Sequence, residues 1–184
     1  MDDKEIVSYL RHLAGVYDAL KGVPLEVIIC GGAALNLLGY VRRVTKDIDI
    51  VSPEVLPSTF TEAAKITADY FGLTPEWINQ GPVDLLRMGL PEGFYARCQQ
   101  LDFHSHLIFL LTSRFDQIHF KLYASVDRGG YHLQDLKALD PTNEELATAV
   151  AWCFTHDVSE PFKEIMKDFL LKNGWKDAAH IVFP

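Results

Sequence analysis

Apolar and polar positions at the start of the chain follow first a helical and then an extended pattern. Apolar residues recur every three or four positions over residues 3–22, which predicts an amphipathic helix. Residues 27–30 (Val-Ile-Ile-Cys) form a short β-branched run typical of a buried strand. Gly31 and Gly32 interrupt this strand, and we expect a short helix over residues 33–38.

The middle of the chain mixes extended and helical patterns. Residues 48–51 predict a second strand and residues 57–71 predict a helix. Residues 72–93 are rich in glycine and proline, and their pattern predicts no regular element. Two further extended segments are predicted over residues 96–103 and 107–111.

From residue 113 onward the pattern is helical. Thr142 and Glu145 form a capping-box pair, which marks the start of one of these helices. We therefore predict an α+β fold in one compact unit. It has a small mixed sheet flanked by helices over residues 1–112, and a helical C-terminal portion over residues 113–184 that packs on it. The predicted C-terminal helices cover residues 114–126, 132–139, 143–156 and 160–173.

Composition and charge narrow the class of protein. The 184 residues carry a net charge of −8, which argues against non-specific DNA binding because such binding needs a broad basic surface. The longest apolar run is too short to span a membrane, and no secretory signal is visible at the acidic start. Three widely spaced cysteines suit buried, reduced thiols. We expect a cytoplasmic protein.

Two acidic residues on the second predicted strand form the first candidate site. Strand residues two positions apart point to the same face, so Asp47 and Asp49 present paired carboxylates. Ile48 and Ile50 then point the other way, into a core. Paired carboxylates repel each other unless a cation lies between them, and oxygen ligands suit Mg²⁺ or Mn²⁺.

The two glycines after the first predicted strand form the second candidate site. Gly31 and Gly32 lead into a helix, whose first backbone N–H groups attract a phosphate. Glycine suits this turn because a side chain would hold the phosphate away from the backbone. Arg42, Arg43 and Lys46 add a basic turn nearby. A phosphate cradle that faces a metal-binding carboxylate pair predicts phosphoryl or nucleotidyl transfer.

These two segments resemble the signature of a known superfamily. Residues 31–35 (Gly-Gly-Ala-Ala-Leu), followed by residues 45–50 (Thr-Lys-Asp-Ile-Asp-Ile), resemble the Gly-[Gly/Ser] … Asp-x-Asp signature of the DNA polymerase β-like nucleotidyltransferases. The chain is similar to the minimal bacterial branch that includes AbiEii-type toxin nucleotidyltransferases. The resemblance extends over roughly residues 25–155 and includes a later helix that bears a lysine, then an arginine and a second helix that bears an aspartate.

The resemblance implies an activity and its partners. The expected reaction is transfer of a nucleoside monophosphate from a nucleoside triphosphate (NTP) to the hydroxyl of a protein, an RNA or a small molecule. The metal would be Mg²⁺ or Mn²⁺, held by Asp47 and Asp49. Gly31, Gly32 and Lys46 would contact the nucleotide. A toxin–antitoxin or defence role, with a cognate partner protein, is part of the same expectation.

Three later residues receive nucleotide-contacting roles from the resemblance, and each has a structural alternative. Lys121 would contact phosphates as a point charge, or it is a solvent-facing helix lysine. Arg128 and Asp135 would help to place the nucleotide, or they form a structural ion pair beside Gly129 and Gly130.

The resemblance also implies a third metal-binding carboxylate on a later strand. Asp102 is the best-placed candidate, since it alternates with Leu101 and Phe103 in an extended segment. If Asp102 lies roughly 4–6 Å from the Asp47 and Asp49 pair, as two ligands of one Mg²⁺ would, we expect an active transferase. If it lies elsewhere and no other acid replaces it, a catalytically inactive nucleotide-binding or partner-binding module is the better hypothesis. A purely structural interaction protein is a third hypothesis.

Overall fold

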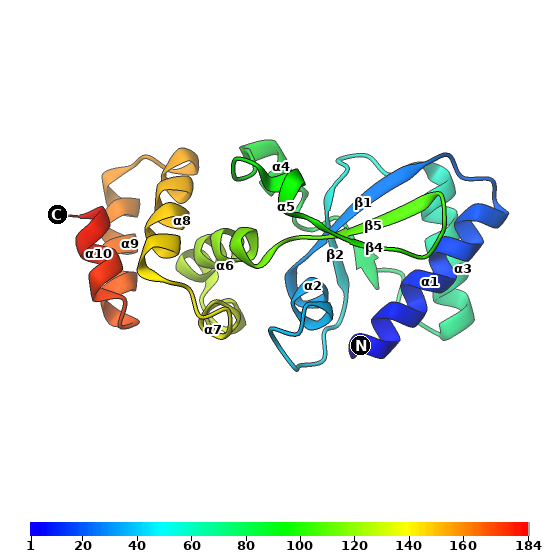
Figure 1. Ribbon diagram of the computed structural model, residues 1–184, viewed down its shortest axis with the longest axis horizontal. Coiled ribbons are helices and arrows are strands. Elements are labelled where there is room, and N and C mark those ends of the chain that lie inside the picture. Colours follow the sequence, from blue (N-terminus) through cyan, green and yellow to red (C-terminus); the bar gives the residue numbers. More distant parts are fainter. Residues whose placement is uncertain (184) are drawn as a thin grey trace. The chain divides into compact units, whose positions relative to one another are not determined.

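The chain divides into two compact units, Met1–Ser113 and a helical unit that begins at Arg114, in a computed structural model that describes residues 1–183. Within these residues, one five-stranded sheet forms the centre of the first unit, in the order β3-β2-β1-β5-β4 (Figure 1). Its strands are β1 (Leu25–Cys30), β2 (Ile48–Ser52), β3 (Ile78–Asn79), β4 (Gln99–Leu101) and β5 (Leu107–Leu111).

The central strand β1 organises the sheet, because it pairs with one antiparallel and one parallel neighbour. It runs antiparallel to β2 and parallel to β5. At the two edges, β3 pairs parallel with β2, and β4 pairs antiparallel with β5. The sheet is therefore mixed, and together with the helices it confirms the predicted α+β class.

Helices cover the sheet of the first unit. α1 and α3 pack against each other, and α1 also contacts β5, so this pair covers one face (Figure 1). α1 begins with a capping box in which the Asp2 side chain accepts a hydrogen bond from the backbone N–H of Glu5, and the Glu5 side chain accepts one from the backbone N–H of Asp2. The helices of this unit are α1 (Asp3–Ala19), α2 (Gly31–Leu37), α3 (Ser58–Phe71), α4 (Val83–Met88) and α5 (Phe94–Arg97).

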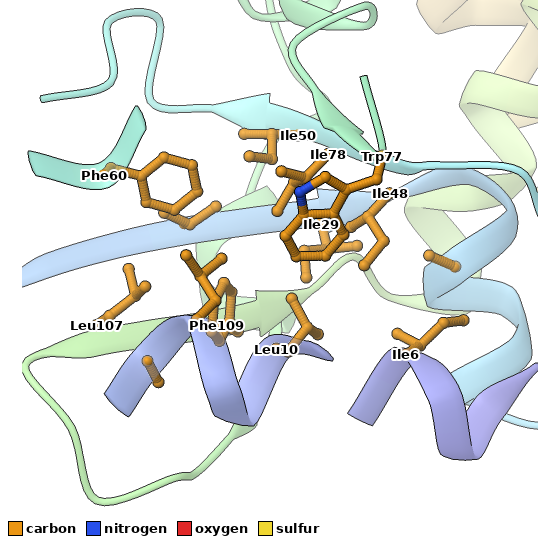
Figure 2. Close-up of a cluster of buried hydrophobic side chains, with 14 of the residues drawn as sticks. Ile6, Leu10, Ile29, Ile48, Ile50, Phe60, Trp77, Ile78, Leu107 and Phe109 are labelled. Atoms are coloured by element: carbon orange, nitrogen blue, oxygen red, sulfur yellow. The ribbon is translucent and has the colours of Figure 1, made fainter. Parts of the chain in front are cut away.

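The apolar core lies between the sheet and this pair of helices. Figure 2 shows Ile6 and Leu10 of α1 directed toward strand residues such as Ile29 and Phe109. Trp77, just before β3, is almost fully buried, and its ring nitrogen donates a hydrogen bond to the backbone oxygen of Ala64 in α3. This bond ties α3 to the β3 edge of the sheet, which positions the residues that follow Trp77.

The second unit is helical throughout the part of the chain that the structure describes. The predicted capping box is present: Thr142 and Glu145 exchange the two expected hydrogen bonds at the start of α8. α6 begins one residue after the predicted boundary at residue 113. The helices are α6 (Arg114–Arg128), α7 (Tyr131–Ala138), α8 (Asn143–His156), α9 (Glu160–Lys172) and α10 (Lys176–Val182).

One predicted element is wrong in part. The extended segment predicted over residues 96–103 begins instead as the helical turn α5, and its strand β4 covers only Gln99–Leu101. The reason is the burial of Phe94, which starts this turn with a backbone hydrogen bond to the oxygen of Pro91. Residues 72–93, for which no element was predicted, contain β3 and α4.

The three cysteines are reduced thiols, of which Cys30 and Cys153 are buried as expected and Cys98 is only partly buried. Burial raises the pKa of Cys153, so this thiol stays protonated at neutral pH. Within residues 1–183, no helix is long and apolar enough to cross a membrane.

Candidate metal and nucleotide site

Asp47 and Asp49 lie on the sheet face opposite the α1 and α3 core. Ile48 and Ile50 are fully buried in that core, so strand alternation turns the neighbouring acids to the other face. Asp49 lies within β2 and Asp47 immediately before it, and both side chains are partly exposed. The alternation predicted from the sequence is therefore confirmed for the two isoleucines.

Gly31 meets the carboxylate of Asp49 because of how β1 and β2 pair. The register places Cys30 opposite Asp49, so the first residue after β1 lies next to this carboxylate. A Cβ atom on Gly31 would lie 2.5 Å from Oδ2 of Asp49, closer than real Cβ contacts allow. Gly31 also has φ of +66°, a conformation that side chains disfavour. Glycine is thus required here for two independent reasons.

Gly32 is covered by side chains of the basic turn. A Cβ atom on Gly32 would lie 3.0 Å from Oγ1 of Thr45 and 3.3 Å from a guanidinium nitrogen of Arg43. The buried side chain of Asn36, in α2, donates a 2.7 Å hydrogen bond to the backbone oxygen of Arg43. α2 therefore holds the turn so that a positive charge lies beside its own first residues.

A second polar segment reaches the acids from β3. Asp49 pairs with Asn79 in the parallel register of β2 and β3. The side-chain nitrogen of Asn79 lies 3.3 Å from Oδ2 of Asp47, and its oxygen accepts a 2.8 Å hydrogen bond from the backbone N–H of Gly81. A Cβ atom on Gly81 would lie 3.9 Å from Oδ1 of Asp49. The two acids, Asn79 and two glycines thus form one cluster.

Asp102 does not join this cluster, which corrects the expectation for a third carboxylate. Leu101 and Phe103 do pack against the core, as the alternation predicted. Asp102, however, lies just beyond β4, where its Oδ1 accepts a 2.7 Å hydrogen bond from the backbone of His104. Its side chain is about half exposed and serves the turn after β4.

Strand register shows how far Asp102 is from the acids. Leu101 pairs with Phe109, and Phe109 pairs with Val27. Leu101 therefore lies level with Val27, three residues before Cys30. Asp102 continues away from Cys30, while Asp49 lies opposite Cys30. The separation is roughly 13 Å along the strands and about 14 Å across three strand spacings. This excludes the metal-bridging distance on which the prediction depended.

Lys46 and the candidate metal-binding acids are the remaining predicted site residues of the first unit. Lys46 is exposed beside Asp47, and its contact with a nucleotide stays a prediction. Across residues 1–183, no group of three or more histidine, cysteine, aspartate or glutamate side chains is arranged to hold a metal ion. The candidate donor set at this site therefore contains two carboxylates.

The later candidates, in the second unit, form two different ion pairs. Lys121 in α6 donates a 2.7 Å hydrogen bond to Asp135 in α7, and both side chains are buried, at 6% and 2% exposure. The exposed Arg128 pairs with its neighbour Asp127 at 3.1 Å. The alternative pairing of Arg128 with Asp135 is therefore wrong, and Lys121 is not a solvent-facing lysine. The Lys121–Asp135 pair ties α6 to α7, whereas the Arg128–Asp127 pair lies within α6. A nucleotide contact of Lys121, Arg128 or Asp135 stays a prediction.

The fold and the acid–glycine cluster define a nucleotidyltransferase-like protein. Residues 5–156 match a protein family described as nucleotidyltransferase of unknown function (DUF6036), and the chain belongs to this family. No significant match to the chain was found among curated proteins or among solved structures.

Sequence reasoning missed Asn79, Gly81 and the role of Thr45. An Asn-x-Gly triplet in a glycine-rich stretch is a turn signal, so the local conformation could have been predicted. The contact of Asn79 with Asp47 could not have been predicted, because it depends on the pairing of β3 with β2, which are separated in the sequence by α3.

The buried Lys121–Asp135 pair predicts a large effect on stability. Replacing Lys121 by methionine removes the buried cation that pairs with Asp135, so we expect the free energy of unfolding to fall by about 3–5 kcal/mol. Arg128→Met is the matched control, since it removes an exposed pair that contributes about 0–1 kcal/mol. The double variant Lys121→Met with Asp135→Leu should recover much of the loss. Urea unfolding followed by circular dichroism measures all three, and equal losses for Lys121→Met and Arg128→Met would contradict a structural role for the buried pair.

Proposed function

We propose that this chain binds a nucleoside triphosphate together with Mg²⁺ or Mn²⁺ at the end of β1. The observation that carries the proposal is the contact of the Asp49 carboxylate with the backbone of Gly31. It brings a group that binds hard cations next to the glycine turn that begins α2, where the triphosphate would bind. Asp47 and Asp49 would hold the cation, and their oxygen donors fit it.

The phosphate side of the proposed site rests on α2 and the basic turn. Gly31 and Gly32 are the first residues of α2, and N–H groups at a helix start have no acceptor within the helix. The Arg43 guanidinium lies over Gly32, and Lys46 is exposed between this turn and the acids. Positive charge and backbone donors together favour the triphosphate.

Family membership supports nucleotidyl transfer as the reaction at this site. In that reaction the acceptor hydroxyl oxygen bonds to the α-phosphorus, the bond from that phosphorus to the bridging oxygen breaks, and pyrophosphate leaves with that oxygen. The hydroxyl proton passes to solvent or to a base. A bound divalent cation would neutralise charge on the phosphates. Asp47 and Asp49 would orient the triphosphate through it.

A second candidate function is nucleotide binding without transfer, and the acid count favours it. Asp102 lies far from the pair, and the described residues offer no three-acid group. Incubation with α-phosphate-labelled NTPs and separate RNA, protein and small-molecule fractions distinguishes the two functions. A transferase moves label to an acceptor and releases pyrophosphate, and Asp47→Asn with Asp49→Asn abolishes both. A binding module retains the nucleotide unchanged.

The acceptor and the cellular role extend the proposal through sequence resemblance alone. The resemblance to AbiEii-type nucleotidyltransferases supports a hydroxyl acceptor on a protein, an RNA or a small molecule. It equally supports a toxin–antitoxin or defence role with a cognate partner protein.

The metal pair is tested by thermal denaturation with each of the four NTPs, with and without Mg²⁺. Ligand at about one hundred times its dissociation constant stabilises the folded chain by about 2.7 kcal/mol, so binding raises the melting temperature. We expect this rise to require Mg²⁺ and to disappear in the double variant Asp47→Asn, Asp49→Asn. The variant should remain folded, because the change removes charge repulsion. A double variant that binds Mg·NTP as tightly as the parent would contradict the site.

The glycine contact is tested by Gly31→Ala with Gly39→Ala as its control. Both glycines have positive φ, so each alanine costs about 1–2 kcal/mol of backbone strain. A Cβ atom on Gly39 meets nothing within 4 Å, whereas one on Gly31 displaces Asp49. We therefore expect both variants to lose stability, Gly31→Ala at least as much as Gly39→Ala, but loss of Mg·NTP binding only in Gly31→Ala, measured by isothermal titration. Equal affinities in the two folded variants would show that this turn is only a strand-to-helix corner.

A further inference from the structure

Asn79 lies beside Asp47 and Asp49, at the position in the sheet where a third metal ligand would lie. Its partner in the β2–β3 register is Asp49, and the preceding pair, Ile48 with Ile78, lies in the core. Residues paired in this way share a face, so Asn79 points to the same side as Asp47 and Asp49. The 3.3 Å contact between its nitrogen and Oδ2 of Asp47 agrees with this placement.

The orientation of the Asn79 amide is determined by Gly81. A backbone N–H can only donate, so the atom that accepts the 2.8 Å hydrogen bond from Gly81 is the amide oxygen. The amide nitrogen therefore faces Asp47, and it also lies 3.5 Å from the backbone oxygen of Glu76. Asn79 thus presents hydrogen atoms to the acids and not a lone pair that could bind a cation.

We propose that Asn79 limits this site to a single divalent cation, bound jointly by the acids and the triphosphate. The inference rests on the proposed function, in which Asp47 and Asp49 hold a metal with the nucleotide. A second cation next to Asp47 would meet the N–H groups of Asn79 on that side, so Asp47 would be its one protein ligand there and water or phosphate oxygens would have to supply the rest. No three-residue group of metal-binding side chains exists within residues 1–183 to supply such ligands elsewhere. Asn79 is accordingly a positioning residue that sets metal stoichiometry.

Asn79→Asp removes the limit of one cation with a minimal change of side-chain shape. The new Oδ1 still accepts the hydrogen bond from Gly81, and the new Oδ2 replaces the nitrogen that lies 3.3 Å from Asp47. Two carboxylates at this distance repel each other, and a second cation between them removes the repulsion. The variant therefore creates a site with three carboxylates from one with two.

Counting bound cations tests the inference without relying on activity. The full chain is loaded with Mn²⁺ and, in turn, with the α,β-methylene analogues of ATP, GTP, CTP and UTP, which resist transfer. Native mass spectrometry then counts Mn²⁺ per chain. We expect one Mn²⁺ in the parent chain and two in Asn79→Asp. Asn143→Asp is the matched control, because it adds the same charge at the start of α8, and it should keep one.

The contradicting results separate this inference from the proposed function. Two Mn²⁺ ions in the parent chain would overturn the limit while leaving metal-dependent nucleotide binding intact, and this count needs no variant. A folded Asn79→Asp that still binds one ion would overturn the role of Asn79. If the parent binds no analogue with Mn²⁺, the proposed function fails, and the inference with it.

Stability without metal provides a second readout. Asn79→Asp should melt at a lower temperature than the parent in the presence of a chelator, because the added carboxylate faces Asp47, and Mn²⁺ should restore the loss. Asn143→Asp should show neither the loss nor the Mn²⁺-dependent recovery. An Asn79→Asp chain whose melting temperature responds to Mn²⁺ no more than the control would contradict the inference.

Discussion

The contact between the Asp49 carboxylate and the backbone of Gly31 is the constraint on which the candidate site depends. It exists because β1 and β2 run antiparallel with Cys30 opposite Asp49, so that the end of one strand meets the start of the other. Only glycine permits the approach, since a Cβ atom would lie 2.5 Å from the carboxylate. Every other feature of the site is placed relative to this pair: the basic turn lies over Gly32, and the β3 segment lies beside Asp49.

The negative charge of Asp47 and Asp49 is partly offset by a neighbouring amide and a nearby guanidinium group. The Asn79 amide donates toward Asp47, and the Arg43 guanidinium lies beside the first residues of α2. A carboxylate pair next to an amide is less repulsive than three carboxylates, so the cluster is compatible with folding in the absence of a cation. The same arrangement leaves fewer protein oxygens for the proposed metal, so in our proposal Asn79 affects both the stability of the fold and the number of cations bound.

The second unit uses similar residue types for a different purpose. Lys121 and Asp135 carry opposite charges on successive helices, and their burial makes them a tie between α6 and α7. Removing one partner of a buried ion pair destabilises a protein much more than replacing both partners by apolar residues. The pair therefore favours the one arrangement of α6 and α7 in which both charges meet. Arg128, only seven residues after Lys121, is exposed and pairs with Asp127. The sequence motif suggests the same nucleotide-contacting role for Lys121 and Arg128, but only Lys121 is buried in an ion pair between helices.

The sequence by itself determined the local elements and the acid–glycine pair of this protein. Periodicity placed the longer helices and the strands β1, β2 and β5, because the 3.6- and 2-residue repeats are properties of the backbone, but it missed β3, α4, α5 and α10. The alternation around Ile48 and Ile50 predicted which way the acids point. Only the tertiary structure decided which segments meet. Leu101 and Phe103 pack against the core as predicted, yet the pairing of β4 with β5 places Asp102 at the far end of the sheet, while Asn79 reaches the acids through β3. Alternation fixes the face of a strand on which a residue lies, whereas strand order and register fix its neighbours, and these depend on contacts between residues far apart in the chain.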